Sequence, residues 1–226
     1  MGRLTQVQKR EEFKLLLHTL ASDLGQVNDR VALYRNLRRA RKSSHSKAFI
    51  NAPTFWCLVL GSLQDAALQG LARAYDQRDR TDVLTLKHML DTIQSEPHFL
   101  MNGIAIDRNQ LEKDLRFVSR RTNASVKHLM LWRNKLFAHR NADKLLTGRI
   151  LSTDHPLTWK EIGTLSETGF AIVNRYSDLL FATVTTRNTD GDDDYLGVLS
   201  LLQAGWEGLD KKLEPSVQTV SQATGQ

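Results

Sequence analysis

Residues 126–140 have the sequence VKHLMLWRNKLFAHR, and this stretch decides the fold class because its apolar side chains recur at the spacing of an α-helix. Residues three or four positions apart share one face of a helix, so the repeat predicts an amphipathic helix through the whole stretch. The apolar face consists of Val126, Leu129, Trp132 and Leu136, and His139 continues it. The predicted helix therefore ends among polar and cationic side chains.

The same helical spacing dominates the rest of the chain. It predicts a first helix from about residue 4 to the basic residues after position 34, and a second that begins around Pro53 and ends near Tyr75. Further helices are expected before Pro97, from Asp107 through the motif, from a capping box at Thr158 and Glu161 to Val184, and from about Tyr195 to Leu213. Whether Thr122 and Asn123 interrupt the helix from Asp107 is open. We therefore expect an all-α bundle of about five to six helices.

Length and composition indicate one globular domain. A chain of 226 residues with 41% hydrophobic and 25% charged residues can bury a sizeable core. Its 13 glycines and 4 prolines leave little room for a loop-rich β architecture. We expect a single domain over residues 1–214. After Pro215 the chain has few residues to bury, so residues 215–226 are expected to form a disordered tail.

The sequence also predicts the compartment. Cys57 is the only cysteine, which excludes a disulfide framework and a cysteine-based metal site within one chain. The N-terminal sequence MGRLTQVQKREEF has no apolar signal core. The longest apolar stretch, around residues 55–63, is about half of the roughly 20 residues that a membrane-spanning helix needs. We expect a cytoplasmic protein that does not enter a membrane.

Positive charge is concentrated around the stretch quoted above. The formal net charge of the chain is +6, and between Lys113 and Arg149 ten Lys or Arg residues stand against two acids. Such a region favours a polyanionic partner such as RNA. A second basic block, over residues 35–47, fits a solvated helix end with a basic loop, and its role stays open.

Inside the basic region, Arg133 and His139 combine a permanent cation with an imidazole that titrates near neutral pH. Their spacing alone is not specific, because several other Arg and His pairs in this Arg-rich chain share it. The context is what distinguishes them: Asn134 follows the Arg, Ala138 precedes the His, and the helical apolar pattern runs through both.

The string RNKLFAHR at residues 133–140 resembles the motif of the HEPN superfamily, in which an Arg, a polar residue and a His recur, and is similar to its abortive-infection (phage-defence) branch. The resemblance implies an HEPN-like helical bundle, a toxin-type endoribonuclease acting on RNA, and a homodimer with a composite cleft. An antitoxin protein is a further candidate partner. Asn141, after AHR, departs from the Asp expected in this branch and leaves any carboxylate partner for His139 unassigned.

The motif residues supply what RNA cleavage by its own 2′-hydroxyl requires. His139 can act as general base or general acid, and Arg133 can bind the phosphate and stabilise charge in the transition state. Asn134 can orient the imidazole or bind a phosphate or ribose oxygen, while Lys135 and Arg140 can attract the strand. This scheme requires no metal and no other cofactor, and the sequence contains no convincing metal-ligand cluster.

Helix geometry adds the expectation of a dimer. On an ideal α-helix, Arg133 and His139 would be separated by a rise of roughly 9 Å and lie about 120° apart around the axis. One helix would present both side chains poorly to a single phosphate. Two copies related by a two-fold axis can place two Arg and two His around one cleft.

Two other interpretations remain open. The same basic cleft fits a non-catalytic HEPN-like module that binds RNA, a nucleotide or a protein partner. Alternatively, His139 is an ordinary packing residue, because it lies seven positions after Trp132 and beside Leu136, and the chain is a purely structural helical dimer.

Overall fold

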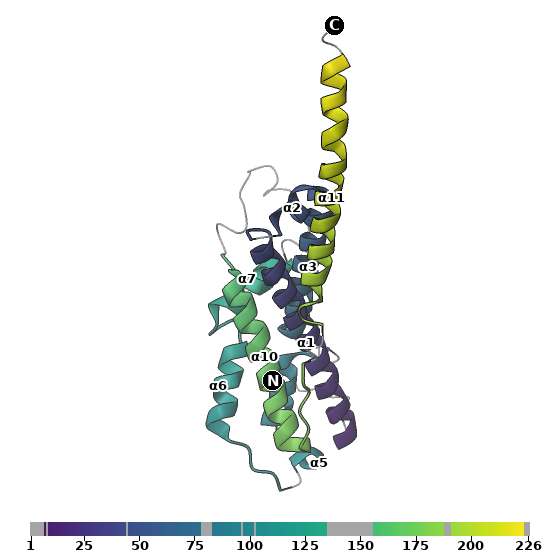
Figure 1. Cartoon of the computed structure of the whole chain (residues 1–226). Helices are drawn as coiled ribbons and strands as arrows, with labels where there is room; N and C mark the ends of the chain where they lie inside the picture. The colour runs from purple at the N-terminus through teal and green to yellow at the C-terminus, as the bar shows by residue number, and fades with distance from the viewer. Residues whose placement is uncertain are drawn as a thin grey trace, which may run out of the picture. The chain divides into compact units, whose positions relative to one another are not determined.

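The computed structural model describes Val7 and residues 9–43, 45–77, 83–95, 97–101, 103–134, 156–187 and 191–223. This part of the chain is helical and contains no strand, which confirms the all-α class. Its helices are α1 Arg10–Ala40, α2 Ser46–Ile50, α3 Pro53–Ala74, α4 Leu86–Gln94, α5 His98–Met101, α6 Arg108–Val118, α7 Ala124–Trp132, α10 Trp159–Phe181 and α11 Asp194–Ala223 (Figure 1).

The described residues contain nine helices, so the expected number of five to six was too low. Two of the additional helices, α2 and α5, are short elements of 5 and 4 residues that periodicity alone does not reveal. The sequence left open whether the helix from Asp107 is interrupted near Thr122 and Asn123, and the structure shows that it is, because α6 ends at Val118 and α7 begins at Ala124.

The chain divides into two compact units. One unit contains residues 1–31 and 64–187, and the other contains residues 32–63 and 188–226. Each unit is therefore built from segments that are distant in the sequence, and α1 and α3 contribute to both. The single domain expected over residues 1–214 stays a prediction.

The first unit has an extensive apolar core. It is formed by the N-terminal part of α1, the C-terminal part of α3, and helices α4, α6, α7 and α10. In Figure 1, α6 and α7 follow one another beside α10. Each fully buried Leu, Ile or Phe side chain contributes roughly 1.5–3 kcal/mol to stability. The largest fully buried apolar residues are Phe13, Leu17, Leu20, Leu24, Leu68, Leu71, Leu86, Met89, Leu90 and Ile93.

A glycine permits close packing inside this core. A Cβ atom added to Gly169 of α10 would lie 3.2 Å from Cδ1 of Leu86 and 3.2 Å from the hydroxyl of Tyr75. That hydroxyl donates a hydrogen bond of 2.8 Å to the carbonyl oxygen of Leu165, and burial raises the pKa of Tyr75. Tyr75 therefore fixes the end of α3 against α10 as a neutral group.

A buried carboxylate joins α6 to α10. Asp114 is 5% exposed, and its oxygens accept hydrogen bonds from Gln110 at 3.0 Å, Arg175 at 2.5 Å and the hydroxyl of Tyr176 at 2.9 Å. Burial, followed by the negative charge of Asp114, raises the pKa of Tyr176. The carboxylate is thereby paired and hydrogen-bonded, which offsets the cost of removing its charge from water.

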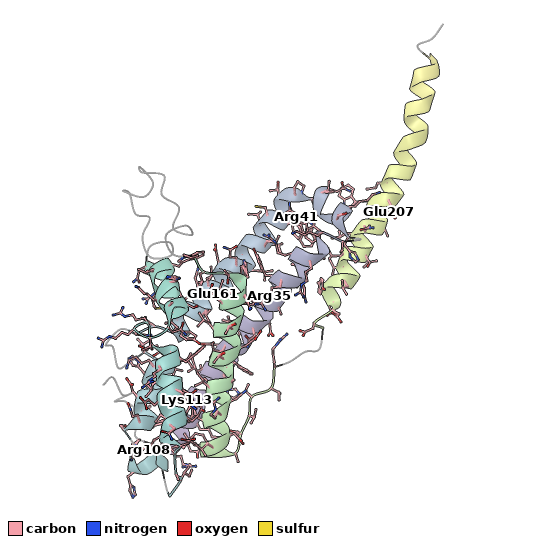
Figure 2. The ribbon with its side chains drawn as sticks, turned by 90° about the vertical axis from the view of Figure 1, so that its left-hand side faces the viewer. Arg35, Arg41, Arg108, Lys113, Glu161 and Glu207 are labelled. Carbon is pink, nitrogen blue, oxygen red and sulfur yellow. The ribbon has the colours of Figure 1, made fainter. Side chains whose placement is uncertain are left out.

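Helix α10 begins at the capping box predicted from the sequence. The hydroxyl of Thr158 accepts a hydrogen bond from the backbone N–H of Glu161, and the Glu161 carboxylate accepts one from the backbone N–H of Thr158. The helix ends at Phe181, earlier than the expected Val184, because Ala182 has a φ of 50° and leaves the right-handed helical region. The first turn of α10, with Glu161, is visible in Figure 2.

The second unit has a smaller core around one tryptophan. The indole N–H of Trp56 donates a hydrogen bond of 2.9 Å to the carbonyl oxygen of Ala48, and its ring lies 4.4 Å from that of Phe49. Helix α11 contacts α2 and buries Leu199. Several apolar side chains of this unit are exposed: Ile50, Phe55, Leu58, Leu196, Val198, Leu201, Leu202 and Leu209.

Helix α11 differs from the expectation at its C-terminal end. It continues to Ala223, whereas the sequence predicted an end at about Leu213. The disordered tail expected over residues 215–226 stays a prediction. The segment after Pro215, SVQTVSQA, contains no glycine or second proline that would stop a helix.

None of the described helices combines the length and the apolar composition that a membrane-spanning helix needs.

Candidate functional site

Helix α7 carries the first two residues of the motif to its C-terminal end. Asn123 caps the helix, because its side-chain oxygen accepts hydrogen bonds from the backbone N–H groups of Ser125 and Val126. After Trp132 the backbone changes to a π-helical turn at Arg133 and Asn134. His139 lies outside the described residues, so the angle of about 120° between Arg133 and His139, calculated for an ideal α-helix, stays a prediction.

The guanidinium group of Arg133 is bound by a carboxylate from another helix end. Its Nη1 donates a hydrogen bond of 2.7 Å to Oδ1 of Asp76, which lies just after α3. The two side chains are 19% and 15% exposed, so this ion pair is shielded more than a surface pair but is not fully buried. An arginine has five N–H donors, so the bond to Asp76 uses only part of the hydrogen-bonding capacity of Arg133.

The residue next to Asp76 binds a second part of the same region. The side-chain amide of Gln77 donates a hydrogen bond of 2.6 Å to the carbonyl oxygen of Val118 and accepts one of 3.2 Å from the backbone N–H of Arg120. Asp76 and Gln77 thus connect the end of α3 to the motif arginine and to the segment that follows α6.

This segment, residues 119–122 with the sequence SRRT, is termed the basic turn. Its backbone is fixed by local hydrogen bonds, from the N–H of Arg121 to the hydroxyl of Ser119 and from the hydroxyl of Thr122 to the carbonyl oxygen of Arg116. The amide of Asn123 donates to the carbonyl oxygen of Phe117 at 2.8 Å. The turn therefore presents two exposed arginines, Arg120 and Arg121, on a defined backbone.

A cavity of about 470 Å³ lies between the basic turn and α7. We term it the cationic cavity; it is lined by Arg120, Arg121, Lys127, Met130, Leu131 and Asn134. Its volume falls within the roughly 300–1,000 Å³ range of small-molecule sites. Three of the lining residues are cationic and none of the six is acidic, and Asn134 belongs to the motif. The cavity and the motif therefore share a residue.

The structure describes only part of the predicted site. Arg133 and Asn134 are adjacent at the end of α7, with Asn134 exposed. His139, Lys135 and Arg140 lie outside the described residues, so their roles stay predictions. Among the described residues, no group of three or more His, Cys, Asp and Glu side chains is arranged to hold a metal ion.

Sequence reasoning missed Asp76 and Gln77. They are separated from their partners by 57 and 41 residues, and neither belongs to a recognisable spacing pattern. Their only sequence signal is their position directly after a predicted helix end. Arg120, Arg121 and Lys127 were recognised as part of the basic region, but the sequence did not show that they line a common cavity.

The comparison with protein families agrees with the motif and the helical fold. A family model for AbiU2, an HEPN family, matches residues 10–199. Because this match covers most of the chain, the protein belongs to the AbiU2 family, in the abortive-infection branch of the HEPN superfamily. No curated protein and no solved structure shows significant similarity to the chain.

Proposed function

We propose that this HEPN domain is an endoribonuclease that cleaves RNA without a metal ion, at a composite site formed by two copies of the chain. The observation that carries the proposal is the ion pair of Arg133, whose guanidinium group is held by Asp76. Arg133 directly precedes Asn134 in the chain, and Asn134 lines the cationic cavity. A phosphate bound there would meet a preoriented guanidinium in a region rich in positive charge.

The proposed reaction is a transesterification within the RNA strand. His139 removes the proton from a ribose 2′-hydroxyl, and the oxygen attacks the adjacent phosphorus. The bond from phosphorus to the 5′-oxygen breaks, and this leaving oxygen takes a proton from an imidazolium, which is His139 of one copy or the other. The products are a 2′,3′-cyclic phosphate and a 5′-hydroxyl. Arg133 stabilises the additional negative charge on the phosphorane oxygens.

Asp76 supports this role through the orientation of Arg133. A guanidinium group on an unrestrained side chain loses rotamer entropy when it binds a phosphate, whereas one that already donates to a carboxylate loses less. The ion pair also lowers the net charge around Arg133, so the remaining attraction for RNA comes from other cations of the basic region, such as Arg120, Arg121 and Lys127 of the cationic cavity.

Cleavage of a mixed RNA substrate in EDTA tests the proposal. Wild-type protein is expected to produce fragments that end in a cyclic phosphate. His139→Ala is expected to lower the rate by roughly 10²–10⁴-fold and Arg133→Ala by roughly 10²–10³-fold. Arg108→Ala, which removes an exposed cation from the first turn of α6, is the matched control and should retain activity.

The ion pair also supports a second function, that of a non-catalytic module that binds RNA, a nucleotide or a protein partner. An arginine that is already paired with a carboxylate can serve chiefly to connect α7 to the end of α3. In that case the wild-type protein binds RNA but produces no fragments in the EDTA assay. Absence of both RNA binding and cleavage, in a preparation that is dimeric by light scattering, would overturn the endoribonuclease and the RNA-binding form of the module.

A further inference from the structure

We infer that the cationic cavity is a binding subsite for one nucleotide of a single-stranded RNA, adjacent to the phosphate that Arg133 is proposed to bind. The inference rests on the proposed function for its substrate class, but it assigns different residues: Arg120, Arg121, Lys127, Met130 and Leu131 do not belong to the motif.

The cations of the cavity come from two elements, α7 and the basic turn. Lys127, Leu131 and Asn134 are four and three residues apart and follow one face of α7 and its continuation. Arg120 and Arg121 approach from the basic turn. Three positive charges around one concavity raise the local concentration of a phosphate far more than the same charges spread over a flat surface.

The anchoring of the basic turn argues against an incidental cluster of solvated arginines. Gln77 binds the backbone on both sides of Ser119, and Ser119, Thr122 and Asn123 fix the rest of the turn. Since Gln77 follows the residue that binds Arg133, one segment sets the position of the basic turn and of the motif arginine together. A strand that contacts both would meet two preoriented cationic groups.

The apolar part of the cavity favours a nucleotide over a bare phosphate. Met130 is 5% exposed and Leu131 is half-buried, so the cavity has an apolar wall as well as cations. A nucleotide matches both, because its phosphate carries the charge and its base has an apolar face. Asn134 offers an amide that can donate to and accept from a base edge or a ribose hydroxyl. Single-stranded RNA exposes all of these groups, whereas a duplex does not.

Binding of a short fluorescein-labelled single-stranded RNA to the full chain tests the inference by anisotropy. The measurement uses the His139→Ala background, so that the strand stays intact. Arg121→Ala with Lys127→Ala removes two cavity cations, and Arg108→Ala with Lys113→Ala removes two exposed cations of α6 that do not line the cavity (Figure 2). Circular dichroism checks that each variant is folded, and Lys127→Ala alone replaces the double variant if that one is not.

The cavity variant is expected to bind RNA at least roughly tenfold more weakly, and the slope of log affinity against log salt should fall by about 0.7 for each phosphate that the variant no longer neutralises. The control variant is expected to stay near the wild-type affinity. Equal losses of affinity in the two variants, or an unchanged affinity in the cavity variant, would overturn the inference. Inorganic polyphosphate that competes as well as unlabelled RNA would overturn its nucleotide part.

The result is separable from the proposed catalysis. Cleavage in EDTA by the wild type, together with unchanged binding in the cavity variant, would refute the subsite and leave the endoribonuclease standing. Cavity-dependent binding without any cleavage by the wild type would refute the endoribonuclease and leave the subsite standing as part of an RNA-binding module. A wild-type protein that binds no single-stranded RNA refutes the subsite directly.

Discussion

At the scale of single residues, the pairing of Arg133 with Asp76 is the least predictable part of the site. Arg133 was identified from its neighbours in the sequence, because the motif is local. Asp76 could not be identified, because a carboxylate 57 residues away becomes its partner only through the path that the chain takes between α3 and α7. The local chemistry of a motif is therefore predictable, whereas the groups that orient it are not.

The ion pair of Arg133 and Asp76 should be measurable by a double-mutant cycle. Each of Arg133→Ala and Asp76→Ala leaves a largely shielded charge without this ion pair, so we expect either change to lower the free energy of unfolding by roughly 1–3 kcal/mol. The double variant should lose less than the sum, with a coupling of roughly 1 kcal/mol or more. Urea denaturation of the four proteins provides the values.

A second ion pair in the same unit serves as the control for that cycle. Arg187 donates to Asp29 at 2.5 Å, but the two side chains are 29% and 47% exposed, so their coupling should be below about 1 kcal/mol. A larger coupling free energy for Arg187 and Asp29 than for Arg133 and Asp76 would contradict the view that Asp76 binds Arg133 more strongly than an exposed ion pair would. Compared with Asp76→Ala, the variant Asp76→Glu should restore RNA cleavage only if Asp76 acts by orienting Arg133 and not by stabilising the fold alone.

At the scale of elements, the sequence predicted helix starts better than helix ends. Asp107, Asn123 and Thr158 each cap the helix that follows, since a short polar side chain binds the backbone N–H groups two or three residues later. These signals are local. Asp107 and Thr158 were recognised as helix starts, whereas Asn123 was expected only near an interruption of the helix. Helix α10 ends at Ala182, which adopts the αL conformation, and helix α11 continues past Pro215. Neither feature has a comparably local signal in the sequence.

The capping box of α10 gives a pH-dependent contribution to stability. Hydrogen bonds from the backbone and the side chain of Thr158 lower the pKa of Glu161, while its partial burial opposes this. A carboxyl group whose pKa is lower in the folded state stabilises the fold above its unfolded pKa, and the contribution is lost as the pH falls through the folded value. We therefore expect wild type to exceed Glu161→Gln in unfolding free energy at neutral pH, with the difference disappearing in acid.

The cap itself is tested by two substitutions at Thr158. Thr158→Ala removes the hydroxyl and should cost about 1 kcal/mol, whereas Thr158→Ser keeps an acceptor and should cost less. Equal losses for Ala and Ser would show that the methyl group, and not the cap, is what matters. A difference between wild type and Glu161→Gln that persists unchanged in acid would contradict the proposed origin of the pKa shift.

At the scale of the whole molecule, the all-helical class and the HEPN family followed from periodicity and one short motif. The division into two units did not, because each unit combines segments that are far apart in the chain. Charge counts located the basic region around Arg133, but only the three-dimensional path of α6, the basic turn and α7 shows that three of its cations share a cavity. The sequence shows which residue types are present, but it does not show how the segments and side chains are arranged in space.

Subunit mixing tests the composite site. If two copies share one cleft, a heterodimer of Arg133→Ala with His139→Ala retains one Arg and one His, and refolding the two inactive variants together should restore part of the cleavage activity. A site contained within one copy would stay inactive in that mixture. The matched control pairs Arg133→Ala with the double variant Arg133→Ala and His139→Ala, a combination that contains no complete set of groups and should show no recovery.

The neighbouring residues Asp76 and Gln77 impose different constraints on how related chains can diverge. Asp76 binds a side chain, so its identity is tied to that of Arg133 and the two positions should covary. Gln77 binds main-chain groups of Val118 and Arg120, so it constrains the length of the connection between α6 and α7 and not the residue types in it. In related chains, we therefore expect Asp76 to restrict which residue stands at position 133, and Gln77 to restrict insertions and deletions between α6 and α7.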